Sequence, residues 1–120
     1  MRPHCAVLSA VAVLLLMASH AVDGEEVCRP SLVVQSVTFS EIDAWRRTWT
    51  AHLAVDAASC ATTSGAFRID FVRLKEDAPD LQFTEPFVWT PGRVEATTIF
   101  AADEAVLSYA IKVPSCPCRR

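Results

Sequence analysis

The chain has 120 residues and a formal net charge of −3, and a little over half of its residues are hydrophobic. One domain with a sizeable core fits this length, and a second domain does not. The acidic balance argues against binding to nucleic acid and to anionic membrane surfaces.

Residues 1–21 have the pattern of a secretory signal peptide. Arg2 and His4 precede an apolar run at Ala6–Ala18, and Ser19-His20-Ala21 places small residues at the −3 and −1 positions of a cleavage site. The run holds 13 residues, fewer than the roughly 20 that a membrane-spanning helix needs. We therefore predict a secreted protein, extracellular or periplasmic, with no transmembrane segment.

Four of the five cysteines lie in the single mature domain that we expect at 22–120. An even number of cysteines in a small secreted chain is typical of disulfides. We therefore predict two disulfides among Cys28, Cys60, Cys116 and Cys118. A thiolate zinc site and a soft-metal carrier are the alternatives, although the Cys-x-Cys spacing here is less usual for zinc than Cys-x2-Cys.

The connectivity of these cysteines is only partly predictable. In an extended segment the Cα atoms of Cys116 and Cys118 lie about 6.5–7 Å apart, at or beyond the usual disulfide limit. A local bridge is therefore disfavoured. We expect Cys28 and Cys60 each to pair with one of the two late cysteines, and both such pairings stay open.

The mature chain is predicted to consist of strands joined by polar turns. Thr48–Asp56 alternates apolar and polar residues, as does Ala66–Lys75 up to a slip at Val72-Arg73-Leu74 that predicts a bulge. Pro86 identifies an edge strand, because proline has no N–H to donate to a neighbour. The predicted strands are Leu32–Phe39, Thr48–Asp56, Ala66–Lys75, Leu81–Trp89, Val94–Phe100 and Ala105–Val113.

Six short strands with no long helix predict an all-β fold. We expect a small antiparallel immunoglobulin-like β-sandwich stapled by disulfides. Trp49 and Trp89 fall on apolar faces and are expected in the core. In the last strand Leu107 is expected to face inward with Tyr109. The connection Glu41–Arg47 has room for one helical turn.

Apolar alternation and a Pro-Gly turn recur through nearly the whole mature chain, at Leu32–Phe39, Trp49–Asp56, Gly65–Ile69 and Thr90-Pro91-Gly92. In these motifs the chain resembles the cell-adhesion-related, immunoglobulin-like module of bacterial surface proteins, the CARDB type. The placement of Cys28, Cys60 and Cys116 around the strands is also similar to the secreted plant family that includes the tapetum determinant-like proteins. Either resemblance implies an extracellular β-sandwich that binds another molecule.

Candidate catalytic residues are few. His52 is the one histidine beyond residue 21, and it is expected on the outward face of its strand. No serine or cysteine nucleophile can be placed beside it from the sequence, so no catalytic triad is predicted. Glu76, Asp77 and Asp80 match no EF-hand spacing and are expected in a solvated turn. We therefore expect no enzyme, no catalytic residue, no metal site and no cofactor.

The function that these observations favour is binding to an extracellular or cell-surface protein. Trp45 lies in a polar connection and is a candidate anchor for such a partner, together with Arg46 and Arg47. A secreted signalling ligand for a cell-surface receptor is the second hypothesis, and a thiolate metal carrier is the third. The sequence does not decide the partner, the binding face or the oligomeric state.

We predict that the secreted protein begins at Val22. The apolar run followed by Ser19-His20-Ala21 carries this prediction, and cleavage after Gly24 is the weaker site. N-terminal sequencing and intact mass of protein collected from the medium check it. Secreted protein that retains Met1 would contradict it.

Overall fold

The computed structural model describes residues 27–120, so the predicted signal peptide at 1–21 lies outside the described residues. Those residues form six strands and no helix. The strands are β1 (Ser31–Phe39), β2 (Arg46–Asp56), β3 (Gly65–Lys75), β4 (Ala78–Trp89), β5 (Gly92–Ala101) and β6 (Glu104–Lys112). Between residues 27 and 120, no helix could span a membrane.

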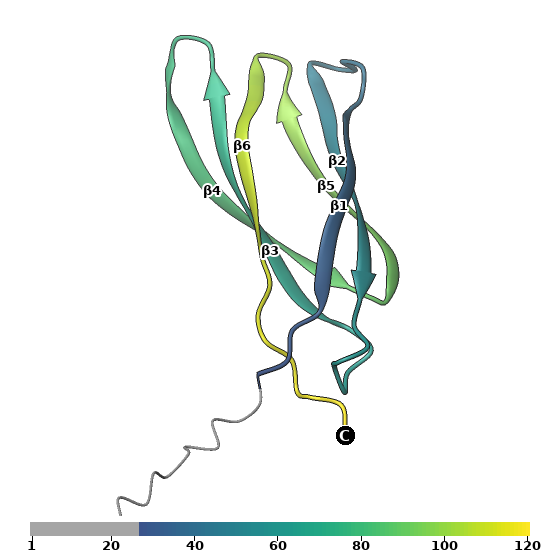
Figure 1. Ribbon diagram of the computed structural model, residues 1–120. Coiled ribbons are helices and arrows are strands. Elements are labelled where there is room, and N and C mark those ends of the chain that lie inside the picture. The colour runs from purple at the N-terminus through teal and green to yellow at the C-terminus, as the bar shows by residue number, and fades with distance from the viewer. Residues whose placement is uncertain (1–26) are drawn as a thin grey trace, which may run out of the picture.

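The strands form two antiparallel sheets, in the orders β1-β2-β5 and β4-β3-β6, and the sheets pack as a sandwich (Figure 1). The predicted fold class is confirmed, and β4, which contains Pro86, is an edge strand as expected. In a constant-type immunoglobulin domain, a seventh strand pairs with the sixth. Within residues 27–120 there is no such strand, so the outer edge of β6 is open.

The two central strands supply the core. Trp49 of β2 and Phe71 of β3 are each 1% exposed, and their rings meet edge to face at 4.9 Å between centroids. Burial of such side chains stabilises the fold by about 1.5–3 kcal/mol each. The predicted alternation is confirmed, since the inward residues of both strands are buried: Trp49, Ala51, Leu53, Val55, Phe67, Ile69 and Phe71. Trp89 at the end of β4 joins them, as predicted.

The bulge predicted in β3 at Val72-Arg73-Leu74 lies instead in its partner strand β6, and β3 itself keeps its alternation. The pairing of β3 with β6 shifts between Val72 and Arg73, and Leu107 is the extra residue of β6 at this point. A bulge reverses the alternation of the strand beyond it. Val106 consequently packs against the core, whereas Leu107 is 56% exposed. The expectation that Leu107 faces inward is therefore wrong.

The connection between β1 and β2 is a tight turn and not a helical one. The backbones of Asp43 and Arg46 exchange two hydrogen bonds, of 2.8 and 3.0 Å. The two residues between them, Ala44 and Trp45, have φ angles of 49° and 65°. Positive φ at both central positions is the geometry of a type I′ hairpin turn. The helical turn for which Glu41–Arg47 has room is not formed.

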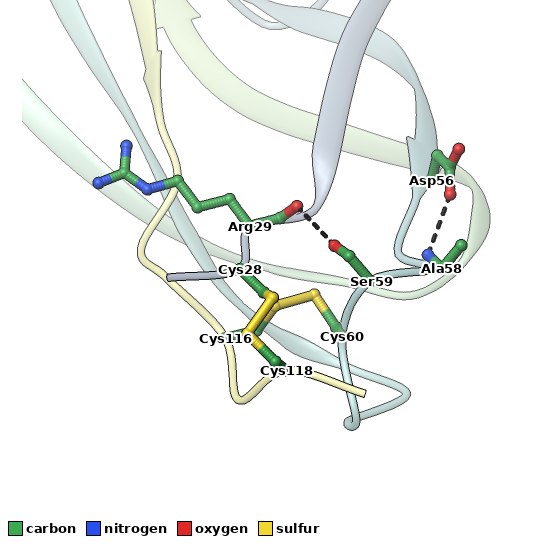
Figure 2. Close-up of a disulfide and its surroundings, with 8 residues drawn as sticks. All are labelled: Cys28, Arg29, Asp56, Ala58, Ser59, Cys60, Cys116 and Cys118. Atoms are coloured by element: carbon green, nitrogen blue, oxygen red, sulfur yellow. Dashed lines mark hydrogen bonds between the residues drawn. A yellow bond between two sulfur atoms is a disulfide. The ribbon is translucent and has the colours of Figure 1, made fainter. Parts of the chain in front are cut away.

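Both disulfides lie at one end of the sandwich, opposite the turns that join β1–β2, β3–β4 and β5–β6 (Figure 1). The bonds are Cys28–Cys118 and Cys60–Cys116, so the long-range pairing is confirmed and one of the two open alternatives is selected (Figure 2). The backbone bridges join the cysteines in the opposite combination, Cys28 with Cys116 and Cys60 with Cys118. In the first bridge the peptide N–H of Cys116 donates to the carbonyl of Cys28 at 2.8 Å. We call this end, comprising residues 28–30, 57–61 and 114–119, the disulfide pole.

The C-terminal segment is held on both sides at the disulfide pole. Ala61 donates its backbone N–H to the carbonyl of Pro117 at 2.7 Å, and Arg119 donates to the carbonyl of Ser59 at 2.8 Å. The hydroxyl of Ser59 donates to the carbonyl of Arg29 at 3.2 Å (Figure 2). The start of β1, the loop after β2 and the C-terminal segment therefore form one hydrogen-bonded unit.

We predict that Gly65→Ala lowers the free energy of unfolding by about 1–3 kcal/mol, as overpacking of a core does. A Cβ on Gly65 would lie 2.6 Å from Nε1 of Trp89, whose ring is buried and cannot yield cheaply. Urea unfolding measures the loss, with Ala66→Ser on the exposed side of the same strand as the control. Equal midpoints for the two variants would contradict the packing described here.

Candidate functional site

The most exposed aromatic side chain of the described residues stands at the turn between β1 and β2. Trp45 is 72% exposed, and its neighbour Ile42 is 58% exposed. The turn is fixed from two directions, by the paired backbones of Asp43 and Arg46 and by Ala102, whose N–H donates to the carbonyl of Trp45 at 2.9 Å. A rigid backbone therefore presents an unburied tryptophan. We call residues 42–46 the hairpin tip.

The backbone of the hairpin tip is unfavourable for the residues that occupy it. Type I′ turns favour Asn-Gly or Asp-Gly, because asparagine, aspartate and glycine tolerate positive φ. Other residues lose about 1–2 kcal/mol in the left-handed conformation, which Ala44 and Trp45 both adopt. Neither side chain is buried, so packing does not offset this conformational cost. Strain of this kind, not offset by packing, is common at functional sites.

Arg46 is exposed on the outer face of the sheet formed by β1, β2 and β5. Its side chain and that of Ile99, which is 62% exposed, line one shallow depression with Glu41 and Asp43. A cation, two carboxylates and an aliphatic group therefore lie next to the exposed indole. This mixture suits a polar protein surface more than a small apolar ligand.

Arg47 also lines this depression, but it is only partly exposed. Strand alternation turns it inward, where its guanidinium lies 4.1 Å from the centroid of the Phe39 ring and donates to the carbonyl of Glu104. The carboxylate of Glu104 accepts from Arg73 at 2.9 Å and from the N–H of Ala101 at 2.6 Å. The structure thus separates the expected trio: Trp45 and Arg46 are exposed neighbours, whereas Arg47 links the two sheets.

His52 lies on the outer face of β2, as expected. Its Nδ1 is 3.2 Å from Oε1 of Glu95, and Ser36 of β1 stands opposite it in the sheet register. This row has the composition of a catalytic triad that the sequence alone could not assemble. No hydrogen bond joins Ser36 to His52 among the described residues, and the side chains of His52 and Glu95 are 40% and 65% exposed. The row lines a depression together with Gln35 and Arg93, and the exposure of His52 and Glu95 is typical of a solvated surface pair.

Metal binding has little support in the described part of the chain. All four sulfur atoms are in disulfides, so none is available as a thiolate ligand. Residues 27–120 contain no group of three or more His, Cys, Asp or Glu side chains placed to hold an ion. A thiolate carrier would first require reduction of both bonds.

A second surface was missed by the sequence reasoning. Val37 and Phe39 of β1 face Val106, Leu107 and Tyr109 of β6 across a groove of about 420 Å³, with Trp49 at its base. We call this groove the seam. The signal that could have found it is the absence of charge in Leu32–Phe39 and Ala105–Ile111.

Comparison of the chain with protein-family models, with curated proteins and with solved structures finds no match. The case for a function therefore rests on the geometry of the hairpin tip and the seam.

We predict different effects for two adjacent arginines. Arg47→Ala removes a cation–π contact and a hydrogen bond, and should lower the free energy of unfolding by about 1–2 kcal/mol. Arg46→Ala, on the exposed face, should change it by less than about 0.5 kcal/mol. Urea unfolding of both variants checks this, and equal losses would contradict the assignment of Arg47 to the inside of the sandwich.

Proposed function

We propose that the chain is a secreted, non-enzymatic binding module that engages a protein at the cell surface or in the extracellular space, and that the hairpin tip makes the contact. The observation that carries this proposal is Trp45, largely exposed on a strained and hydrogen-bonded turn. A tryptophan placed there adds little to the stability of the isolated chain. Its contact area is available to a partner.

The chemistry of the tip suits protein recognition. Tryptophan and arginine are the residues most enriched among those that dominate binding energy at protein interfaces, and Trp45 and Arg46 are adjacent and exposed. A partner pocket that closes over an indole buries about 150–250 Å² of its surface. Because hydrogen bonds already fix the turn, binding would cost little loop entropy.

The disulfides support an extracellular compartment. Such bonds persist outside the reducing cytosol, and the predicted signal peptide at 1–21 is consistent with export. The two resemblances seen in the sequence, to CARDB-type modules and to tapetum determinant-like proteins, would both place such a sandwich outside the cell. A hydrolase triad would need a hydrogen bond between Ser36 and His52, and the two residues are only opposite each other in the sheet register.

We predict that Trp45→Gly abolishes capture of the partner without loss of stability. Glycine tolerates the positive φ, so the free energy of unfolding should stay level or rise by up to about 1 kcal/mol. The mature protein is immobilised, exposed to the extracellular fluid of its own source, and the captured proteins are quantified by mass spectrometry. The controls are Val88→Ala, which truncates an apolar side chain of similar exposure on β4, and His52→Ala.

A protein captured equally by the wild type and both controls, and lost with Trp45→Gly, would support the proposal. Capture that persists with Trp45→Gly would contradict the role of the tip. A turnover activity abolished by His52→Ala would contradict the non-enzymatic function.

A further inference from the structure

The four edge strands of the sandwich differ in how they are protected. Natural edge strands carry charged residues or proline that discourage pairing with another chain. β4 contains Pro79, Asp80, Glu85 and Pro86, and β5 contains Arg93 and Glu95. β1 has no charged residue or proline, and β6 has charges only at its ends, Glu104 and Lys112. The two unprotected edges are the two that border the seam.

The exposed apolar side chains of the seam line one groove between the two sheets. Trp49 pairs with Phe39 in one sheet, and its ring lies 5.3 Å from that of Tyr109 in the other. Val37, Phe39 and Tyr109 are each 36–37% exposed, and Leu107 is 56% exposed. The open stretches of β1 and β6 therefore face outward side by side.

We propose that the seam is a homodimer interface, in which a second copy of the chain pairs β1 with its own β1 and β6 with its own β6. A twofold axis that is perpendicular to the sheets and passes through the seam would bring each of these edges beside its own copy. In such antiparallel self-pairing, residues near the axis meet their own copies, so a charge there would meet a like charge. The middle of both strands is uncharged, so this surface is complementary to itself.

The size of the surface agrees with a dimer. Strands of this length are about 30 Å long, and two stacked sheets with their outer side chains are about 20 Å across, so each copy would contribute roughly 600 Å². The two copies would bury about 1,200 Å², the lower limit for specific protein interfaces. An extended peptide of another protein could add as a strand to the edge of β6 or to the edge of β1, but one such strand would leave the backbone groups of the other edge unpaired.

This dimer has a consequence that rests on the proposed function of the hairpin tip. Antiparallel pairing points the two copies in opposite directions, and the tip lies at the end of the sandwich opposite the disulfide pole (Figure 1). The two Trp45 side chains would therefore stand at opposite ends of the dimer. Such a dimer would bridge two partner molecules.

Sedimentation velocity and light scattering of the mature protein test the interface without any partner. Over concentrations from about 1 µM to about 1 mM, we expect a shift from monomer to dimer mass. Leu107→Lys places a charge beside the axis and should raise the dimer Kd by about tenfold or more. Val37→Lys, on the other strand of the seam, should do the same, whereas Val88→Lys on the protected edge should leave the Kd unchanged.

Circular dichroism establishes that each variant is folded. Because partner capture through Trp45 is measured separately, loss of dimerisation with capture intact would affect only the dimer proposal. A wild-type protein that stays monomeric up to about 1 mM would overturn that proposal. A dimer equally sensitive to Val88→Lys and Leu107→Lys would also overturn it, as would a monomer whose seam binds an extended peptide of another protein.

Discussion

The two disulfides are the constraint on which the rest of the structure depends. β1 and β6 belong to different sheets and share no strand pairing, and they are joined at the disulfide pole through Cys28–Cys118 and the hydrogen bond from Cys116 to Cys28. The bonds close loops with sequence separations of 90 and 56 residues. In the chain-entropy model each such closure stabilises the fold by about 4 kcal/mol.

The opposite end of the sandwich is organised by charge. Arg73 and Glu104 form an ion pair with side chains only 19% and 13% exposed, and Arg47 closes the space between the sheets above Phe39. This polar packing fixes the turn between β5 and β6. The backbone N–H of Ala102 in that turn donates a hydrogen bond to the carbonyl of Trp45. Covalent bonds thus secure one end of the sandwich, and the other end presents the exposed indole that we propose contacts a partner.

Much of this fold was predictable from the sequence, because alternation fixes which residues of a strand face the core. The strands around Trp49 and Phe71 were predictable on that basis, and the long-range disulfides were predictable from the close spacing of Cys116 and Cys118. The orientation of Leu107 was not, because one extra residue in β6 reverses the pattern. The positive φ of Ala44 and Trp45 was not predictable either, since neither residue favours it. The row of Ser36, His52 and Glu95 depends on strand order, which no local pattern encodes.

Disulfide mapping of the secreted, non-reduced protein tests the central claim most directly. Proteolysis at Arg and Lys leaves Cys116 and Cys118 in one peptide, so electron-transfer fragmentation between them is needed to assign each bond. The structure predicts Cys28 bonded to Cys118 and Cys60 bonded to Cys116. A Cys28–Cys60 link, a local Cys116–Cys118 bridge or four free thiols would contradict it.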